Sequence, residues 1–130
     1  MPCYYPMRAW KSSSGITFKR NSGYSDLPDI HIKCRRCIGC RLDQSFDWTL
    51  RITLEDSMQE NPSSFVSLTY NPDNLPENGT LVKRDLELFF KRLRKKLPNT
   101  KIRYYAVGEY GGLTKRPHYH IIFFGYQPRS

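Results

Sequence analysis

Two histidines near the end of the chain have a spacing that suits a metal site. They belong to residues 116–125, RPHYHIIFFG, where one residue separates them and four apolar residues follow. If this segment is a β-strand, His118 and His120 project from one face, about 6–7 Å apart, and Tyr119 projects from the other. Two imidazoles at this spacing can share one metal ion. The apolar residues 121–124 are typical of a strand buried on both faces.

A carboxylate joins the histidines if the preceding segment folds back. Residues 104–110, YYAVGEY, resemble a strand, and the Gly and Pro residues within 111–117 can close an antiparallel hairpin. That hairpin would place Glu109 beside the two imidazoles. Such a set, with open coordination positions, suits a divalent cation that handles phosphate oxygen. The alternative is an exposed histidine pair that holds no ligand.

Four cysteines form a second cluster of potential ligands. Cys34, Cys37 and Cys40 have the spacing C-x2-C-x2-C, which lets neighbouring thiolates converge on one ion. A tetrahedral zinc site needs a fourth ligand, for which Cys3 is favoured over His31. We expect nearby arginines to lower the thiol pKa values and Gly39 to supply freedom for a tight turn. An iron–sulfur cluster, plain reduced thiols and disulfides are the alternatives.

The composition predicts a basic domain that binds a negatively charged partner. The 130 residues suffice for one compact domain, and 21 Lys and Arg against 12 Asp and Glu give a formal net charge of +9. This charge favours nucleic acid as partner, and aromatics at 14% suit stacking on unpaired bases. No segment approaches the roughly 18 apolar residues of a membrane span, and no signal-peptide core is present. We therefore expect a soluble intracellular protein with no membrane partner.

Hydrophobic periodicity predicts two helices and three strands. Residues 41–60 carry an apolar stripe every four residues, which we expect to lie mostly in the core: Leu42, Phe46, Leu50 and Leu54. Residues 82–97 form a stronger amphipathic pattern. The other face of that helix is basic, which suits either the helix dipole or phosphate contacts. Strands are predicted at residues 65–70, 101–108 and 119–124, with a shorter one at 16–19.

This order of elements predicts an α+β fold with a mainly antiparallel sheet and helices packed on one face. We expect two parts. Residues 1–40 would be a cysteine-containing, zinc-stapled segment packed on the core. Residues 41–130 would be the core itself, with the metal ligands and the nucleic acid on the open face of the sheet.

Together these motifs resemble a known family. Residues 65–70, FVSLTY, resemble the first motif of rolling-circle replication initiators, and residues 116–125 resemble the His–hydrophobic–His motif of the HUH endonucleases. The flanking segments CIGCRLDQSFDWTLRITLE, SLTYNPDNLP and LFFKRLRKKL are similar to replication initiation proteins of gokushovirus-type microviruses, which are single-stranded DNA phages. The resemblance covers residues 34–125.

The resemblance implies a sheet-centred fold of the RNA-recognition-motif type and an Mg²⁺ or Mn²⁺ site made by Glu109, His118 and His120. It also implies nicking of single-stranded DNA at a phage replication origin, in the cytoplasm of the host. A tyrosine would attack the scissile phosphate, leaving a 5′-phosphotyrosine bond and a free 3′-hydroxyl group. Host replication machinery is a further expected partner. The candidate DNA-binding residues are Tyr70, Asn71, Lys115 and Arg116.

One motif of the family does not appear. The third motif is a nucleophilic Tyr on a helix after the histidine strand, with a Lys shortly after it. Only YQPRS follows Gly125, and no Y-x-x-K occurs in the chain. We expect the nucleophile to lie beyond residue 130 of a longer protein or to have been lost. A non-catalytic module for single-stranded nucleic acid and a metallohydrolase that uses metal-bound water are the other functions left open.

Overall fold

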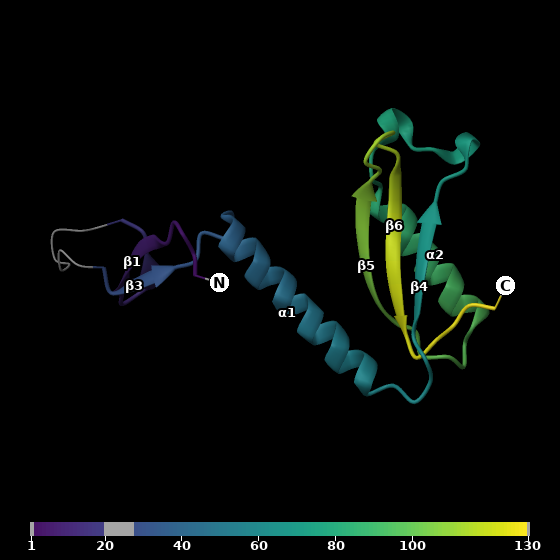
Figure 1. The fold of residues 1–130 in the computed structure, drawn as a ribbon, viewed down its shortest axis with the longest axis horizontal. Helices are drawn as coiled ribbons and strands as arrows, with labels where there is room; N and C mark the ends of the chain where they lie inside the picture. Colours follow the sequence, from purple (N-terminus) through teal and green to yellow (C-terminus); the bar gives the residue numbers. More distant parts are fainter. Residues whose placement is uncertain (1, 20–27, 130) are drawn as a thin grey trace. The chain divides into compact units, whose positions relative to one another are not determined.

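The computed structural model describes residues 2–19 and 28–129. It divides into two compact units, Met1–Arg51 and Ile52–Ser130, each described here by itself. The elements are β1 (Met7–Ser12), β2 (Gly15–Thr17), β3 (Ile30–Ile32), α1 (Ile38–Ser57), β4 (Ser64–Thr69), the 3₁₀ helices η1 (Pro72–Asn74) and η2 (Glu77–Gly79), α2 (Lys83–Lys96), β5 (Arg103–Tyr110) and β6 (Pro117–Phe124) (Figure 1). The predicted α+β class is confirmed.

The first unit has a small sheet of its own. β1 is the middle strand and pairs antiparallel with β2 and with β3. The sequence predicted only the neighbourhood of β2, because β3 is short and both β1 and β3 lie beside prolines. Buried hydrophobic side chains among the described residues of this unit are few: Ala9, Trp10 and Cys40.

Helix α1 begins three residues before the prediction and ends at Ser57. Only Gly39 and Cys40 of this helix are buried. The expectation that its apolar stripe lies mostly in the core is wrong, since the four side chains are exposed: Leu42, Phe46, Leu50 and Leu54. In the second unit, α2 supplies the helical side chains of the core instead. Among the residues that the structure describes, neither long helix combines the length and apolar character needed to cross a bilayer.

The second unit is built on a three-stranded antiparallel sheet in the order β4-β6-β5. β6 is the central strand and runs antiparallel to both neighbours, so β4 and β5 are parallel to each other. Helix α2 joins these two outer strands and lies behind the sheet in Figure 1. The predicted order of helix, strand, helix, strand and strand from residue 40 onward is confirmed.

The two faces of this sheet differ in chemistry because side chains alternate along each strand. On β6, Tyr119, Ile121 and Phe123 are buried on the side of α2. Helix α2 contributes the buried Phe90, with partly buried apolar neighbours at Leu86, Phe89, Leu93 and Leu97. The alternate positions of β6, which include both histidines, therefore lie on the face away from α2.

Tyrosine hydroxyl groups hold the beginning of α2. The cap residue Val82 offers no side-chain hydrogen bond to the helix. Instead, the Tyr119 hydroxyl donates to the Val82 carbonyl oxygen (2.9 Å) and accepts from its N–H (3.0 Å). The Tyr70 hydroxyl donates to Asp85 Oδ2 at 2.8 Å, within the first turn. The central strand and the helix are thus joined by polar as well as apolar contacts.

Replacing Phe90 with alanine should destabilise the chain strongly, because this ring stacks on Tyr104 with centroids 3.5 Å apart and packs against Phe123. A cavity at such a site costs about 3–5 kcal/mol in the free energy of unfolding. The exposed neighbour Lys91 is the matched control, and its alanine variant should change stability by less than about 0.5 kcal/mol. Urea denaturation measures both. Equal midpoints would contradict the placement of Phe90.

Candidate metal centres

The register of the second sheet brings three potential ligands together. Glu109 on β5 is the direct cross-strand partner of His118 on β6. His120 lies two residues along the same face of β6. The two Nε2 atoms are 3.1 Å apart, and Glu109 Oε2 lies 3.2 Å from His120 Nε2 and 3.8 Å from His118 Nε2. The hairpin that the sequence predicts therefore places the carboxylate beside both imidazoles.

These distances fit a shared cation. Around a six-coordinate ion with ligands at about 2.1 Å, adjacent ligand atoms lie about 3 Å apart. Two of the three separations between the ligand atoms, 3.1 and 3.2 Å, match this value. All three atoms lie within 4.8 Å of one another. Two nitrogens and one carboxylate oxygen, with the remaining positions facing solvent, are a donor set used by divalent transition metals.

Contacts around the imidazoles orient their Nε2 atoms. His118 Nδ1 lies 3.2 Å from the Arg116 carbonyl oxygen, which can only accept, so that nitrogen carries the proton and the Nε2 lone pair is free for a ligand. His120 Nδ1 lies 2.9 Å from Ser67 Oγ, a group that donates or accepts. When the Ser67 hydroxyl oxygen accepts a hydrogen bond from His120 Nδ1, the lone pair of His120 Nε2 is free for the same ligand. Support of this kind is typical of histidines that bind metals.

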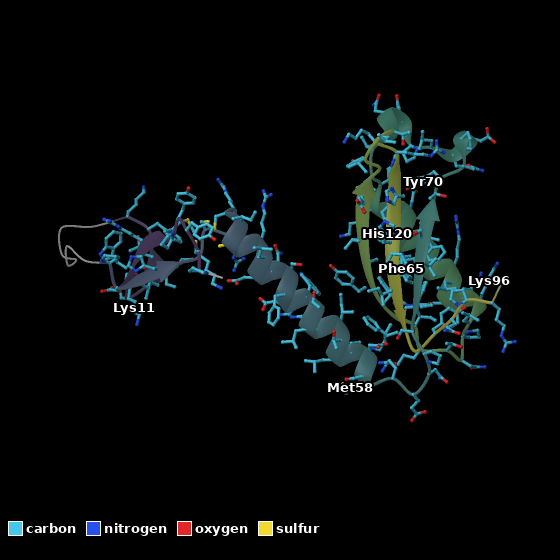
Figure 2. All side chains as sticks on the ribbon, viewed as in Figure 1. Lys11, Met58, Phe65, Tyr70, Lys96 and His120 are labelled. Atoms are coloured by element: carbon cyan, nitrogen blue, oxygen red, sulfur yellow. The ribbon has the colours of Figure 1, made fainter. Side chains whose placement is uncertain are left out.

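An aromatic ring also covers one side of the site. Phe65 on β4 stacks on the His120 ring with centroids 5.2 Å apart and an interplanar angle of 22°, and Figure 2 labels both residues. The Phe65 side chain is nevertheless 66% exposed. Glu109 is 60% exposed, whereas the histidines are 20% and 27% exposed. A ligand from solvent can thus reach the carboxylate and the exposed ring together.

Sequence reasoning missed Phe65 and Ser67 as parts of this site. Both precede apolar residues in FVSLTY that are partly buried against the core, so the alternation places Phe65 and Ser67 together on the other face of the strand. Their position beside His120 depends on the pairing of β4 with β6, in which Ser67 opposes His120. Alternation was a usable signal for the face, but the sequence carried no signal for the register.

The four candidate DNA-binding residues lie at the end of the same sheet, and three have partners within the protein. Tyr70 donates to Asp85, and its pKa is raised by burial and by hydrogen bonds with Tyr119 and Asp85. Asn71 accepts from the Asn74 N–H as the cap of η1, and Arg116 donates to the Tyr70 carbonyl oxygen at 2.7 Å. Lys115 is exposed in the hairpin with φ 53°. Contact of these residues with DNA stays a prediction.

The hairpin and the segment around η2 line an open cavity of about 450 Å³ at this end of the sheet. Lys115 and Arg116 contribute to its wall, together with Tyr110, Asn78 and Thr80. The Tyr110 hydroxyl accepts from the Leu81 N–H at 3.0 Å. Some lining residues therefore adjoin Glu109 and His118 in the sequence, and two others, Lys115 and Arg116, are basic.

The tyrosines of the second unit offer no hydroxyl group at the candidate metal site. Tyr119 faces α2, and Tyr104 stacks on Phe90 in the same layer. Tyr126 packs against Phe123. Tyr105 is on the face of Glu109, but four residues of strand place it about 13 Å along β5. None of these hydroxyl groups lies beside the ligand atoms of Glu109, His118 and His120.

In the first unit, the four cysteines converge on one point. Their Sγ atoms lie within 4.8 Å of one another, with Cys34–Cys40 at 3.9 Å and Cys3–Cys37 at 4.0 Å. The edge of a tetrahedral ZnS₄ site is about 3.8 Å, from Zn–S bonds of about 2.3 Å. A disulfide needs about 2.05 Å, and all four residues are free thiols. His31, the other candidate fourth ligand, does not belong to this group.

Backbone N–H groups, and not the nearby arginines, set the thiol chemistry. The N–H groups of Tyr4 and Cys40 point at Cys37 Sγ and lower its pKa to about 6. The N–H groups of Arg36 and Cys37 lower the pKa of Cys34. Burial raises the pKa of Cys40 to about 12. The expectation that guanidinium charges lower these pKa values is therefore wrong, because hydrogen bonds at short range dominate.

Gly39 has a different role from the one predicted. It lies inside α1, and the left-handed residue of the cysteine turn is Arg35, with φ 59°. A Cβ atom at Gly39 would lie 2.3 Å from the Pro2 carbonyl oxygen. The missing side chain thus lets the N-terminal segment approach the helix, which brings Cys3 to the other three thiols.

Three phage proteins are similar to this chain over most of its length. Replication-associated protein VP4 of Bdellovibrio phage phiMH2K is 32% identical over 98% of this chain and 42% of its own length. Replication-associated protein ORF2 of Spiroplasma virus 4 is 40% identical, covering 86% of this chain and 37% of that protein. Replication-associated protein ORF4 of Chlamydia phage 1 is 36% identical, covering 76% of this chain and 25% of that protein. No solved structure gives a significant match.

The chain spans less than half the length of each of these relatives. A family model described as replication-associated protein ORF2/G2P matches residues 63–130, which include both outer strands, α2 and the histidine strand. The predicted resemblance to phage replication proteins is confirmed by this match. Since the match covers more than half of the residues, the chain belongs to the replication-associated protein ORF2/G2P family.

Proposed function

We propose that this chain is the metal- and strand-binding part of a phage replication initiator that nicks single-stranded DNA in the host cytoplasm. The observation that carries the proposal is the convergence of Glu109, His118 and His120 on the open face of the sheet. Membership of the replication-associated family agrees with it. The relatives are longer than this chain, so the complete reaction belongs to the longer protein.

The chemistry follows from what these side chains can hold. An Mg²⁺ or Mn²⁺ ion bound there would act as a Lewis acid on a non-bridging phosphate oxygen. The protein's own part is to orient the donors: Arg116 and Ser67 fix the two imidazole rings, and Glu109 supplies negative charge. Because their geometry is set before the substrate arrives, little reorganisation is needed when it binds.

The open face offers a path for unpaired bases. Phe65, Tyr105 and Ile122 are neighbours in register across the three strands, on the same face as the histidines. An exposed aromatic ring stacks on a base of any sequence, whereas Lys115 at the hairpin can contact the phosphate that follows. A single strand laid over this face would pass the metal ligands.

The nucleophile is proposed to come from the longer protein. A tyrosine hydroxyl would attack the phosphorus and lose its proton to solvent. The bond from phosphorus to the 3′-oxygen would break, that oxygen would take a proton to become a free 3′-hydroxyl group, and the phosphate would remain in a 5′-phosphotyrosine bond. The described tyrosines of the second unit have other positions, and Tyr70 in particular keeps its proton because burial raises its pKa. A chain without that tyrosine binds DNA and does not cut it, which is also the behaviour of the alternative, a non-catalytic binding module.

We further propose that Cys3, Cys34, Cys37 and Cys40 hold a structural Zn²⁺. The support is the tetrahedral spacing of the sulfurs and the N–H groups directed at Cys34 and Cys37, which stabilise thiolates. The described residues of the first unit include few buried apolar side chains, so a metal would add to the stability of this small core. Four thiolates would fill the coordination positions of such an ion, so its role would be structural.

Removing one imidazole should abolish divalent-metal binding and leave the fold intact. We expect His118→Ala and His120→Ala each to weaken Mn²⁺ binding by at least about 100-fold in calorimetry, since losing even supporting contacts costs 10–100-fold. His31→Ala is the matched control, because the third histidine of the chain lies on β3 in the first unit. Unchanged affinity in the two β6 variants would refute the site.

Iron can report whether DNA passes the same point. With Fe²⁺, ascorbate and peroxide, a single-stranded oligonucleotide bound to the chain should be cut by radicals near the site, because a two-histidine, one-carboxylate set binds Fe²⁺. Cleavage should vanish in His118→Ala and persist in His31→Ala. With Mn²⁺, the chain alone should form no covalent protein–DNA adduct. Cleavage by Mn²⁺ without an adduct would favour a metallohydrolase, and binding without iron cleavage would favour the non-catalytic module.

Elemental analysis of untreated protein should find one zinc per chain. Cys3→Ser should lower this content and His31→Ala should not, which tests the fourth ligand directly. The pKa of Cys37 is lowered to about 6, so its sulfur is a thiolate at neutral pH and becomes protonated as the pH falls through that value. Because a bound ion competes with this proton, zinc should be retained at neutral pH and released only below about pH 6. Metal-free protein at neutral pH would contradict the proposal.

A further inference from the structure

Helix α2 carries a charged surface that the proposed metal centre does not use. Its apolar side chains face the buried side of the sheet, where they meet Ile121 and Phe123. The histidines project from the opposite side of the same strand. The outward surface of α2 is therefore separated from the metal ligands by the helix and the whole thickness of the sheet (Figure 1).

The charge of this surface is concentrated in the last two turns. Residues 91–96, KRLRKK, hold five cations and no acid, and these cations are exposed: Lys91, Arg92, Arg94, Lys95 and Lys96. In the first turns, by contrast, Glu87 pairs with Lys83 and Arg84. Arg94 lies over the rings of Phe90 and Tyr104. Within residues 2–19 and 28–129, no carboxylate pairs with the other four.

The helix dipole does not account for this density. The C-terminus of a helix carries the equivalent of about half a negative charge, which one or two cations near the last turn already complement. Lys91 and Lys95, and likewise Arg92 and Lys96, are like-charge pairs four residues apart, and such pairs destabilise a helix. A polyanion bound along this surface would remove that repulsion.

We propose that the exposed basic surface formed by Lys91, Arg92, Lys95 and Lys96 binds the phosphate backbone of duplex DNA. The choice of DNA rests on the proposed replication function. The choice of duplex rests on composition: residues 91–96 contain no aromatic side chain that could stack on unpaired bases, whereas Phe65 on the other face is exposed for that purpose. The protein thus has one surface for a single strand and another for the duplex beside it.

The two surfaces can be tested separately, in buffer without added Mg²⁺ or Mn²⁺, so that binding does not require the cation proposed at Glu109. Lys91→Gln/Lys95→Gln should weaken binding of a random-sequence duplex by about tenfold or more near 0.1 M salt. The slope of log K against log salt should fall by up to about 0.9 for each contact removed. Binding of a single strand, and Mn²⁺ binding measured separately, should change little. Phe65→Ala should have the opposite pattern, weakening the single strand and sparing the duplex.

Two variants control for net charge and for folding. Lys11→Gln/Lys19→Gln removes the same charge from the first unit, where both side chains are exposed, and should leave most duplex affinity in place. Lys91→Arg/Lys95→Arg keeps the charge and should retain duplex binding. The proposal is overturned if the wild-type chain binds no duplex without added Mg²⁺ or Mn²⁺, or if both glutamine pairs weaken duplex binding equally. Because these measurements need no cation at Glu109, a failed divalent-metal site would leave their outcome readable.

Discussion

The pairing of β6 with both of its neighbours is the constraint on which the second unit depends. This strand has partners on both edges, so its alternation is imposed on the whole sheet. One set of its side chains builds the core with Phe90, and the other set presents His118 and His120. A slip of one residue would exchange the two sets, burying imidazoles and exposing Ile121 and Phe123. The same packing that stabilises the core therefore also holds the candidate ligands in place.

Separation of chemistry between the two faces follows from this constraint. The helix side is closed by apolar contacts and by the hydroxyl groups of Tyr70 and Tyr119, which are occupied in holding the start of α2. The open side keeps polar and aromatic groups that have room for a ligand, among them Glu109 and Phe65. Tyrosines are abundant, yet most of those in the second unit serve the closed side. This distribution explains why the described tyrosines of the second unit offer no hydroxyl group at the candidate metal site.

The first unit relies less on a hydrophobic core than the second unit does. Among its described residues the core is small, and the strands β1, β2 and β3 bury little apolar surface. Small units of this kind commonly need a metal or a covalent link to fold stably. Here Gly39 allows the Pro2 backbone to come close, and the N–H groups of a tight turn stabilise the thiolates. Backbone hydrogen bonds thus affect the pKa values of Cys34 and Cys37 more than the charges of nearby arginines do.

The sequence alone determined the elements whose signals are local. Alternation marked the strands of the second sheet and the shared face of the two histidines, helical periodicity marked α2, and cysteine spacing marked the thiol cluster. Tertiary structure decided the rest: the register that sets Ser67 and Phe65 beside His120, the second small sheet, the hydrogen bonds that lower the pKa of Cys37, and the exposure of the α1 stripe. The physical reason is that periodicity reports which way a side chain points, whereas its neighbours depend on which segments pair, and pairing is chosen by contacts between residues far apart in the chain.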